Sequence, residues 1–219
     1  MSSFLQRWDV LLCLALQMIF LTWPQLDTAV TGFFYQEGVG FYLSNNPLVQ
    51  FSYHTFAHLH FYVLPALVLA LIWFVFRSGK PRPVVYLLVV LIIGPGLVVN
   101  EIFKAESGRA RPAHTELFGG DKTFSPALTN SDQCEKNCSF VSGHAAMGFY
   151  LLAFAWVFKQ RRWLLMGIVL GALVGFGRVV QGAHFFSDVV FSFWLVYFTA
   201  LIFAKWFFGS TQIRQPLAK

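Results

Sequence analysis

Residues Asn137–Phe149 read NCSFVSGHAAMGF, a short polar turn that leads directly into an apolar run. Ser142, Gly143 and His144 stand where this apolar run begins. Such residues are typical of a helix start, whose free backbone N–H groups and positive dipole end favour an anion such as phosphate. Ordinary helix capping explains the same residues. The function of the turn therefore depends on which other side chains come near it.

The composition places this turn in a membrane protein. Of the 219 residues, 57% are hydrophobic, 18% are aromatic and only 12% are charged, and the mean hydropathy is +0.60. Soluble domains carry about 25% charged residues. The net charge of +6 comes without a basic stripe. We therefore expect no nucleic-acid partner and attribute the positive charge to membrane topology.

Six apolar runs predict an all-α, integral membrane bundle of six transmembrane helices. A helix needs about 20 apolar residues to cross a bilayer, and the first and fourth runs are shorter than this. The first run lacks a convincing small-residue cleavage site, so we interpret it as a retained span and not as a signal peptide. We expect a single domain over residues 1–219. The runs are Trp8–Trp23, Ala57–Phe76, Pro83–Phe103, Ser142–Phe158, Trp163–Val180 and Val189–Phe208.

Charge counting predicts the orientation of the bundle. With six spans both termini lie on one side, together with ten of the sixteen basic residues and only one acidic residue, Asp9. By the positive-inside rule this side is cytoplasmic. The long polar loop Lys104–Val141, between the third and fourth spans, then faces outward. The ten basic residues are Arg7, Arg77, Lys80, Arg82, Lys159, Arg161, Arg162, Lys205, Arg214 and Lys219.

The cysteines agree with this orientation. Cys134 and Cys138 lie in the outward loop, which offers too few further ligands for a zinc site. The pair therefore favours a local disulfide, which is stable in an oxidising compartment. Cys13 lies in an apolar run, where we expect a packed core residue.

Between the first two spans, Gln25–Phe56 mixes aromatic and polar residues and predicts a connector along the membrane surface. His54, His58 and His60 lie here and at the start of the second span. No cysteine or carboxylate accompanies them. This favours positions at the membrane interface over metal ligation.

The fifth run carries Gly167, Gly171 and Gly175 at intervals of four residues. This spacing places three small residues on one helix face. It favours close packing of a neighbouring helix over a glycine-lined cavity.

Eight residues near the outer ends of the spans form a chemically coherent set. Three of them are cations that can hold phosphate oxygens. His184 and Asp188 are one helical turn apart, so the carboxylate can hold the imidazole tautomer and leave the other nitrogen free to attack. His144 can protonate a leaving alkoxide. The set predicts phosphoryl transfer by fixed charge, with no metal and no cofactor. The eight are Lys104, Arg111, Ser142, Gly143, His144, Arg178, His184 and Asp188.

These residues fall into three linked motifs within residues 104–188. In order, spacing and span placement, the motifs resemble the signature of the type 2 phosphatidic acid phosphatase family, membrane relatives of the soluble vanadium haloperoxidases. Three linked motifs are far more specific than any one of them. They are Lys104-x6-Arg111-Pro112, Ser142-Gly143-His144 and Arg178-x5-His184-x3-Asp188.

The resemblance implies a six-helix membrane phosphatase that needs no Mg²⁺ and acts on lipid phosphates. It implies that His184 is the nucleophile of a phosphohistidine intermediate, that Asp188 orients it and that His144 is the general acid. The phosphate-binding residues that it implies are Lys104, Arg111, Ser142, Gly143 and Arg178.

Two positions depart from the family pattern. Val141 stands where proline generally precedes Ser-Gly-His, which changes the rigidity of the turn. Gly177 stands where serine generally precedes the arginine, which removes one hydroxyl donor. Neither departure removes a chemical role, so we expect activity to survive.

More of the chain resembles one branch of this family, the bacterial lipid A 4′-phosphatases. The similar segments are Gly94–Asn100 (GPGLVVN), Gly119–Lys122 (GGDK), the cysteine pair followed by SFVSG, and Gln181–Val190 (QGAHFFSDVV). Some members of the branch lack the histidine at the position of His144, which this chain keeps. The branch implies lipid A as substrate, in the bacterial inner (cytoplasmic) membrane with the site facing the periplasm.

Other functions remain open at this point. Relatives with the full signature act on undecaprenyl pyrophosphate, a polyprenyl phosphate substrate, or on phosphatidylglycerol phosphate. Phosphatidic acid is a further phospholipid candidate. A phosphotransferase that passes the phosphoryl group from His184 to a second lipid would use the same residues. A non-enzymatic lipid carrier or scaffold would need the cations but not the nucleophile, so His184, Asp188 and His144 argue against it.

Overall fold

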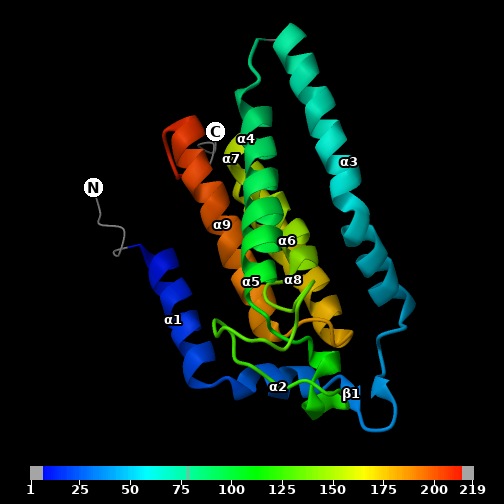
Figure 1. Ribbon diagram of the computed structural model, residues 1–219. Coiled ribbons are helices and arrows are strands. Elements are labelled where there is room, and N and C mark those ends of the chain that lie inside the picture. The colour runs from blue at the N-terminus through cyan, green and yellow to red at the C-terminus, as the bar shows by residue number, and fades with distance from the viewer. Residues whose placement is uncertain (1–6, 78, 214–219) are drawn as a thin grey trace.

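The computed structural model describes residues 7–77 and 79–213 and is predominantly helical. Arg214 and Lys219, two of the basic residues counted for orientation, lie outside the described residues. The apolar helices run side by side, and the loops and short turns of residues 107–142 gather at one end (Figure 1). This end, the lower one in Figure 1, is called the loop end below.

Within the described residues, four continuous helices are long and apolar enough to cross a membrane. A fifth span results if the bent pair α1 and α2 counts as one. The sequence prediction of an α-helical membrane protein therefore holds, while the number six remains a prediction. The four are α3 (Pro47–Arg77), a rod made of α4 (Arg82–Leu91), the π-helix η2 (Ile92–Phe103) and α5 (Lys104–Glu106), α8 (Arg161–Val180) and α9 (Phe186–Phe208).

The first apolar run forms α1 (Trp8–Thr22), which bends by 83° into α2 (Gln25–Gly32). The bend falls at Trp23–Pro24, because proline disfavours the α conformation of the residue before it. Trp23 accordingly has φ −126° and ψ 67°. Helix α2 lies across the loop end of the bundle (Figure 1). It therefore brings side chains of the N-terminal segment to the same place as the predicted site.

The connector predicted over Gln25–Phe56 is only partly irregular. After α2 it forms a short antiparallel hairpin of β1 (Tyr35–Gln36) and β2 (Gly40–Phe41), with Tyr35 opposite Phe41. Helix α3 then begins at Pro47, ten residues before the predicted span. The prediction stopped short because polar residues on this first part of α3 interrupt the apolar run.

The fourth apolar run lies at the centre of the molecule. It forms α6 (Gly143–Phe149), the 3-10 turn η5 (Tyr150–Ala153) and α7 (Phe154–Phe158), and most of it is buried. A Cβ atom on Gly171 would lie 2.1 Å from Cδ1 of Phe149, and one on Gly167 would lie 2.3 Å from the backbone N of Leu152. The packing function predicted for these glycines is therefore confirmed.

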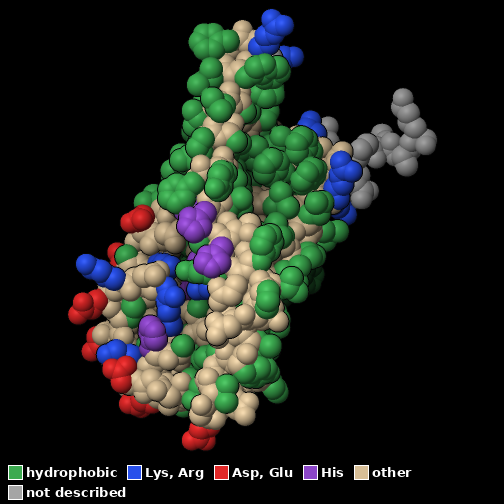
Figure 2. Space-filling view, turned by 90° about the vertical axis from the view of Figure 1, so that its right-hand side faces the viewer, with side chains coloured by type: hydrophobic (Ala, Val, Ile, Leu, Met, Phe, Trp, Pro, Cys, Tyr) green, Lys and Arg blue, Asp and Glu red, His purple; other side chains and the backbone are tan. Residues whose placement is uncertain are grey.

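Helix α3 lies at the edge of the bundle (Figure 1), and its partly buried residues Phe56, Leu59, Val63 and Leu67 pack against the core. None of its 31 residues is buried, although the helix is strongly apolar. Lipid solvates such a surface, so it needs no protein cover. Figure 2 shows the same principle over one face of the molecule. Hydrophobic side chains form a broad band; Lys and Arg lie at one end, and Asp and Glu gather towards the other end together with His and further Lys and Arg.

Residues 107–142 contain two short 3-10 turns, η3 (Pro112–His114) and η4 (Glu116–Phe118), and otherwise follow an irregular path. Cys134 and Cys138 form a disulfide within this loop. Gly108 has a φ of +58°, and a Cβ atom there would lie 1.5 Å from the carbonyl oxygen of Ser131. The loop can thus turn back on itself directly after α5 only with glycine at this position.

Candidate active site

All eight predicted site residues lie at the loop end, where the span ends converge (Figure 1). The rod ends at Lys104–Glu106, α6 starts at Gly143, and α8 ends at Val180 beside the start of α9. His184 stands in the turn between α8 and α9. Helices that are far apart in sequence therefore place the three motifs around one point.

The orientation of His184 is fixed by a backbone carbonyl. Its Nδ1 lies 2.7 Å from the carbonyl oxygen of Ser139. A carbonyl oxygen only accepts hydrogen bonds, so Nδ1 carries the proton and Nε2 keeps its lone pair. Nε2 is buried and has no hydrogen-bond partner in the part of the chain that the structure describes. The imidazole is therefore held in the tautomer that a nucleophile needs.

The surroundings of His184 also keep it neutral. Burial lowers its pKa to about 4, and the charges of Arg178 and Lys104 act in the same direction. The Asp188 carboxylate opposes the shift. Because the pKa lies well below 7, the neutral form predominates at physiological pH.

Asp188 is buried in the first turn of α9 and acts on more than one partner. Its Oδ2 lies 3.4 Å from Nδ1 of His184 and accepts bonds from the Ser139 hydroxyl at 2.5 Å and the Phe185 backbone N at 2.8 Å. Its Oδ1 lies 2.6 Å from Nη1 of Arg109. We expected Asp188 to set the histidine tautomer. In the structure His184 Nδ1 lies closer to the Ser139 carbonyl, at 2.7 Å, than to Asp188, at 3.4 Å. Asp188 contacts both His184 and Ser139 and so supports the position of each.

Arg109 is a residue of the site that sequence reasoning missed. Only 1% of it is exposed, and its Nη2 lies 2.8 Å from Oδ2 of Asp27 in α2. The same carboxylate accepts a 2.5 Å bond from the Ser187 hydroxyl. Arg109 thus joins Asp27 and Asp188, two buried carboxylates from opposite ends of the sequence. The position of Arg109, two residues before Arg111, is the only sequence signal for a role in the site. Nothing in the sequence pairs Arg109 with Asp27, 82 residues away.

The three predicted phosphate-binding cations lie near one another. Lys104 is close enough to Arg111, Arg178 and Asp188 for their charges to act on its ammonium group. The Arg178 guanidinium lies 4.6 Å from the ring centre of Tyr53 in α3 and also contacts Gln181. Its Nε is buried and lacks a partner among the described residues. This arrangement leaves donors for an anion.

Ser142, Gly143 and His144 open α6 as predicted. The Ser142 Oγ accepts a 3.4 Å bond from the Ala145 backbone N, so it caps the helix and keeps its own proton for a further acceptor. A Cβ atom on Gly143 would lie 2.6 Å from Oδ1 of Asn100, which explains the glycine. The Asn100 side chain, and not the backbone conformation of Gly143, therefore makes this position tight.

The His144 ring stacks on Tyr53, with 5.1 Å between ring centres and 22° between planes. Its Nε2 is buried and unpartnered within residues 7–77 and 79–213. Tyr53 therefore contacts both His144 and Arg178. Sequence reasoning missed it, because an aromatic residue in an apolar helix carries no functional signal.

The two departures from the family pattern have different surroundings. Val141 is completely buried in the core. At Gly177 the nearest atom to an added Cβ would be the Ser52 hydroxyl oxygen, at 4.0 Å. Ser52 belongs to α3 and precedes Tyr53, so a hydroxyl from another helix lies beside the position of the missing one.

No group of three His, Cys, Asp or Glu side chains suited to a metal ion occurs among the described residues. Metal independence stays a prediction, because this observation concerns the protein side chains and not the reaction. The three cations of the motifs, Lys104, Arg111 and Arg178, are groups that can neutralise a phosphate here.

Comparisons with known proteins agree with the motifs. A lipid A 4′-phosphatase of Francisella tularensis subsp. novicida (strain U112) is 37% identical over 212 residues, covering 90% of this chain and 95% of the relative. One from Rhizobium etli is 39% identical over 133 residues, 58% of this chain and 51% of the relative. A lipid A 1-phosphatase of Rhizobium johnstonii is 34% identical over 119 residues, 52% and 46% of the two chains. No solved structure matches.

The family model of the PAP2 superfamily matches residues 83–212, more than half of the chain. This range contains all eight predicted site residues, whereas Asp27 and Tyr53 lie outside it. The resemblance to the type 2 phosphatidic acid phosphatases, and to their lipid A 4′-phosphatase branch, is confirmed. The chain therefore belongs to the PAP2 superfamily.

Proposed function

We propose that this protein is a membrane lipid phosphatase that removes a phosphate from lipid A. Membership of the PAP2 superfamily supports the reaction class, and the relatives named as lipid A 4′- and 1-phosphatases support the substrate. One structural observation carries the proposal above the others. The Nε2 atom of His184 is buried, unprotonated and without a partner among the described residues, and the charges of Arg178 and Lys104 act on this histidine.

The reaction follows from this geometry. The Nε2 lone pair of His184 attacks phosphorus, a phosphorus–nitrogen bond forms, and the bond to the lipid oxygen breaks. His144, in its protonated form, donates a proton to the leaving oxygen and becomes neutral. A water molecule then attacks the phosphohistidine, gives up a proton to His144, and releases inorganic phosphate and neutral His184. Asp188 stabilises the imidazole while it carries the extra charge.

Fixed positive charge stabilises the transferring phosphoryl group. Lys104, Arg111 and Arg178 place three cations around the nucleophile, and Ser142 and the Gly143 backbone add neutral donors. Cations and oriented donors that surround a phosphoryl group stabilise the charge that develops in the transition state. We therefore propose that the reaction proceeds without a metal ion.

Two cavities suit a lipid with a large polar headgroup. Beside Arg111 lies a cavity of about 570 Å³ whose lining includes His114, Lys122, Gln133 and Glu135. These side chains can donate to and accept from sugar hydroxyls, and the volume is typical of ligand sites. Between α3 and the rod lies a mainly apolar groove of about 650 Å³, which extends from Leu64 and Leu97 to Asn100. Acyl chains fit such a groove.

For the cellular setting we propose the bacterial inner membrane. The chain forms one catalytic domain of six spans, with both termini cytoplasmic and the loop end in the periplasm. The positive-inside rule and the disulfide of the loop support this orientation independently. Lipid A in the outer leaflet of that membrane then has its phosphates at the depth of the site.

Phosphate release from a panel of lipids tests the proposal. Purified protein with EDTA should release inorganic phosphate from lipid A faster than from undecaprenyl pyrophosphate, phosphatidylglycerol phosphate or phosphatidic acid. Mass spectrometry of the product identifies the 4′- or the 1-position. Activity that vanishes with EDTA and returns with Mg²⁺ contradicts the metal-free mechanism. Radiolabel that moves to a second lipid without free phosphate identifies a phosphotransferase instead.

A further inference from the structure

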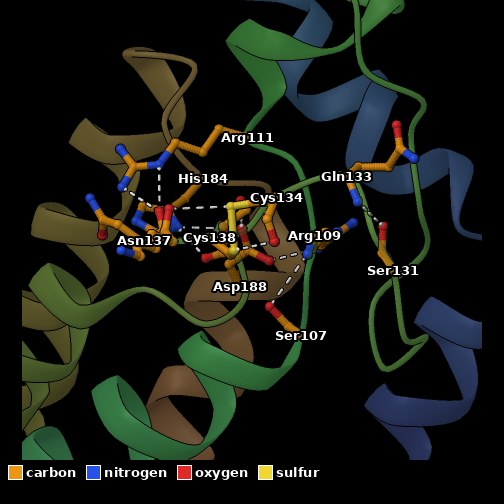
Figure 3. Close-up of a disulfide and its surroundings, with 12 residues drawn as sticks. Ser107, Arg109, Arg111, Ser131, Gln133, Cys134, Asn137, Cys138, His184 and Asp188 are labelled. Atoms are coloured by element: carbon orange, nitrogen blue, oxygen red, sulfur yellow. Dashed lines mark hydrogen bonds and ion pairs between the residues drawn. A yellow bond between two sulfur atoms is a disulfide. The ribbon is translucent and has the colours of Figure 1, made fainter.

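The disulfide of the long loop contacts the phosphate-binding end of the site through one carbonyl group. Cys134 and Cys138 close a loop of five residues that contains Asn137. The Arg111 guanidinium donates to the Asn137 carbonyl oxygen with both Nε, at 3.2 Å, and Nη2, at 2.9 Å (Figure 3). Asn137 has a φ of 54°, which asparagine tolerates better than most residues. The closed loop thus presents its carbonyl to Arg111.

On its other side the disulfide leads directly to the nucleophile. Ser139 follows Cys138 and is completely buried. Its carbonyl accepts from Nδ1 of His184, its hydroxyl donates to Asp188, and its backbone N donates to the Arg109 carbonyl at 2.9 Å. Three consecutive residues, Asn137 to Ser139, therefore connect the disulfide to the phosphate-binding arginine and to the attacking histidine.

We infer that the Cys134–Cys138 disulfide is a positioning element of the active site, which holds Arg111 and His184 in register for phosphoryl transfer. The inference rests on the proposed function of these two residues. It assigns the disulfide a part in catalysis beyond closing a surface loop.

The loop has little else to hold it in place. Residues 130–137 are polar, form no helix or strand, and are mostly exposed or half-exposed. Besides the Arg111 contact, its ties to neighbouring segments include the Gln133 amide oxygen, which accepts from the Thr123 backbone N at 3.0 Å, and the Ser131 backbone N, which donates to the Ser107 carbonyl at 3.1 Å. Breaking the disulfide gives the Asn137 carbonyl many more conformations. A displacement of about 1 Å in a positioned group can lower a rate by about 100-fold.

The experiment replaces both cysteines in Cys134→Ser/Cys138→Ser and compares the variant with wild type and with Cys13→Ala. Cys13 is a buried cysteine of α1 outside the site, so its replacement controls for loss of a sulfur atom. We expect kcat/KM for phosphate release to fall by about 10- to 100-fold in the double variant and less than about twofold in the control. Thermal unfolding of each protein in detergent accompanies the rates.

Two readouts separate positioning from loss of stability. Displacement of Arg111 weakens vanadate binding, so the inhibition constant should rise about tenfold at a temperature where the variant is folded. Loosening of Ser139 admits water around His184, so the acidic limb of the pH–rate profile should move to higher pH. A double-serine variant with wild-type kcat/KM, vanadate inhibition and pH profile overturns the inference. So does a variant that loses activity only where it unfolds.

Reduction provides the same test without mutation. A dithiol converts the disulfide to two thiols and is itself oxidised to a cyclic disulfide. Wild type should then lose activity to the level of the double variant, and the double variant should not respond. Direct binding of vanadate, followed by protein fluorescence, keeps the inference separate from the proposed function. If wild type releases no phosphate from any lipid, the proposed function fails. Disulfide-dependent vanadate binding would still support the positioning of Arg111, and disulfide-independent binding would refute it.

Discussion

Arg109 and Asp188 form a completely buried ion pair, with 2.6 Å between Nη1 and Oδ1. The pair joins the start of the long loop to the first turn of α9, which directly follows the turn that contains His184. Asp27 contacts the other side of the guanidinium from α2. The planar guanidinium thus ties three distant segments together, with one fixed positive charge between the Asp27 and Asp188 carboxylates.

Removal of this guanidinium should destabilise the protein strongly. In Arg109→Met two buried carboxylates lose their cation, so we expect the free energy of unfolding to fall by about 3–5 kcal/mol. Reversible unfolding in mixed detergent measures the change. Arg162→Met replaces an exposed arginine of α8 and should stay within about 0.5 kcal/mol of wild type. Equal effects of the two substitutions would contradict the structural part assigned to Arg109.

Replacement of His184, the proposed nucleophile, should abolish turnover. In His184→Gln the amide cannot form a phosphorylated intermediate, so kcat should fall by about 1,000-fold or more. Phosphate release and acid-labile labelling of the protein by a radioactive substrate measure the loss. His58→Gln, at an exposed histidine of α3, serves as the control and should keep normal kcat. A His184 variant with a near-normal rate would refute the assignment.

The pH dependence should follow the neutral form of His184. Burial lowers the pKa of this histidine to about 4, so the attacking form predominates above that pH and is lost as the pH falls through it. We expect kcat/KM to fall on the acidic side near pH 4 and not near the ordinary histidine pKa of about 6.5. Circular dichroism at each pH checks that the protein remains folded. An acidic limb near pH 6.5 in folded protein would show that the site is wetter than the structure implies.

Tyr53 should contribute through its ring and not through its hydroxyl. It stacks on His144 and lies under the Arg178 guanidinium. A cation–π contact of about 0.5–2 kcal/mol corresponds to a twofold to thirtyfold change in rate. We therefore expect Tyr53→Ala to lower kcat/KM within about this range and Tyr53→Phe to stay near wild type. A larger loss in the phenylalanine variant would instead assign a function to the hydroxyl.

Ser52 should supply the hydroxyl that Gly177 lacks. Its oxygen lies 4.0 Å from the position of a Cβ atom on Gly177, next to Arg178. Loss of a hydrogen bond worth about 1 kcal/mol would lower kcat/KM by about fivefold in Ser52→Ala. Thr55→Ala removes an exposed hydroxyl one turn away on α3 and should have no effect. Equal rates in the two variants would show that the Ser52 hydroxyl does not replace the one that is missing at Gly177.

The sequence by itself determined the local chemistry of this protein. Apolar runs of membrane length indicate helices because lipid offers no hydrogen bonds to an unpaired backbone. The spacing of His184 and Asp188 indicates a shared helix end, and Ser142-Gly143-His144 indicates a capped start. Each of these inferences needs only neighbours within a few residues, so each can be drawn from the order of residues alone.

Only the tertiary structure decided which distant groups complete the site. Asp27 meets Arg109 across 82 residues, and Tyr53 meets His144 and Arg178 from a helix that is otherwise apolar. The bond from His184 to the Ser139 carbonyl cannot be predicted from the sequence either, because every residue carries a carbonyl group. Contacts of this kind depend on how the helices pack, and packing is set by the fit of whole surfaces and not by any short pattern of residues.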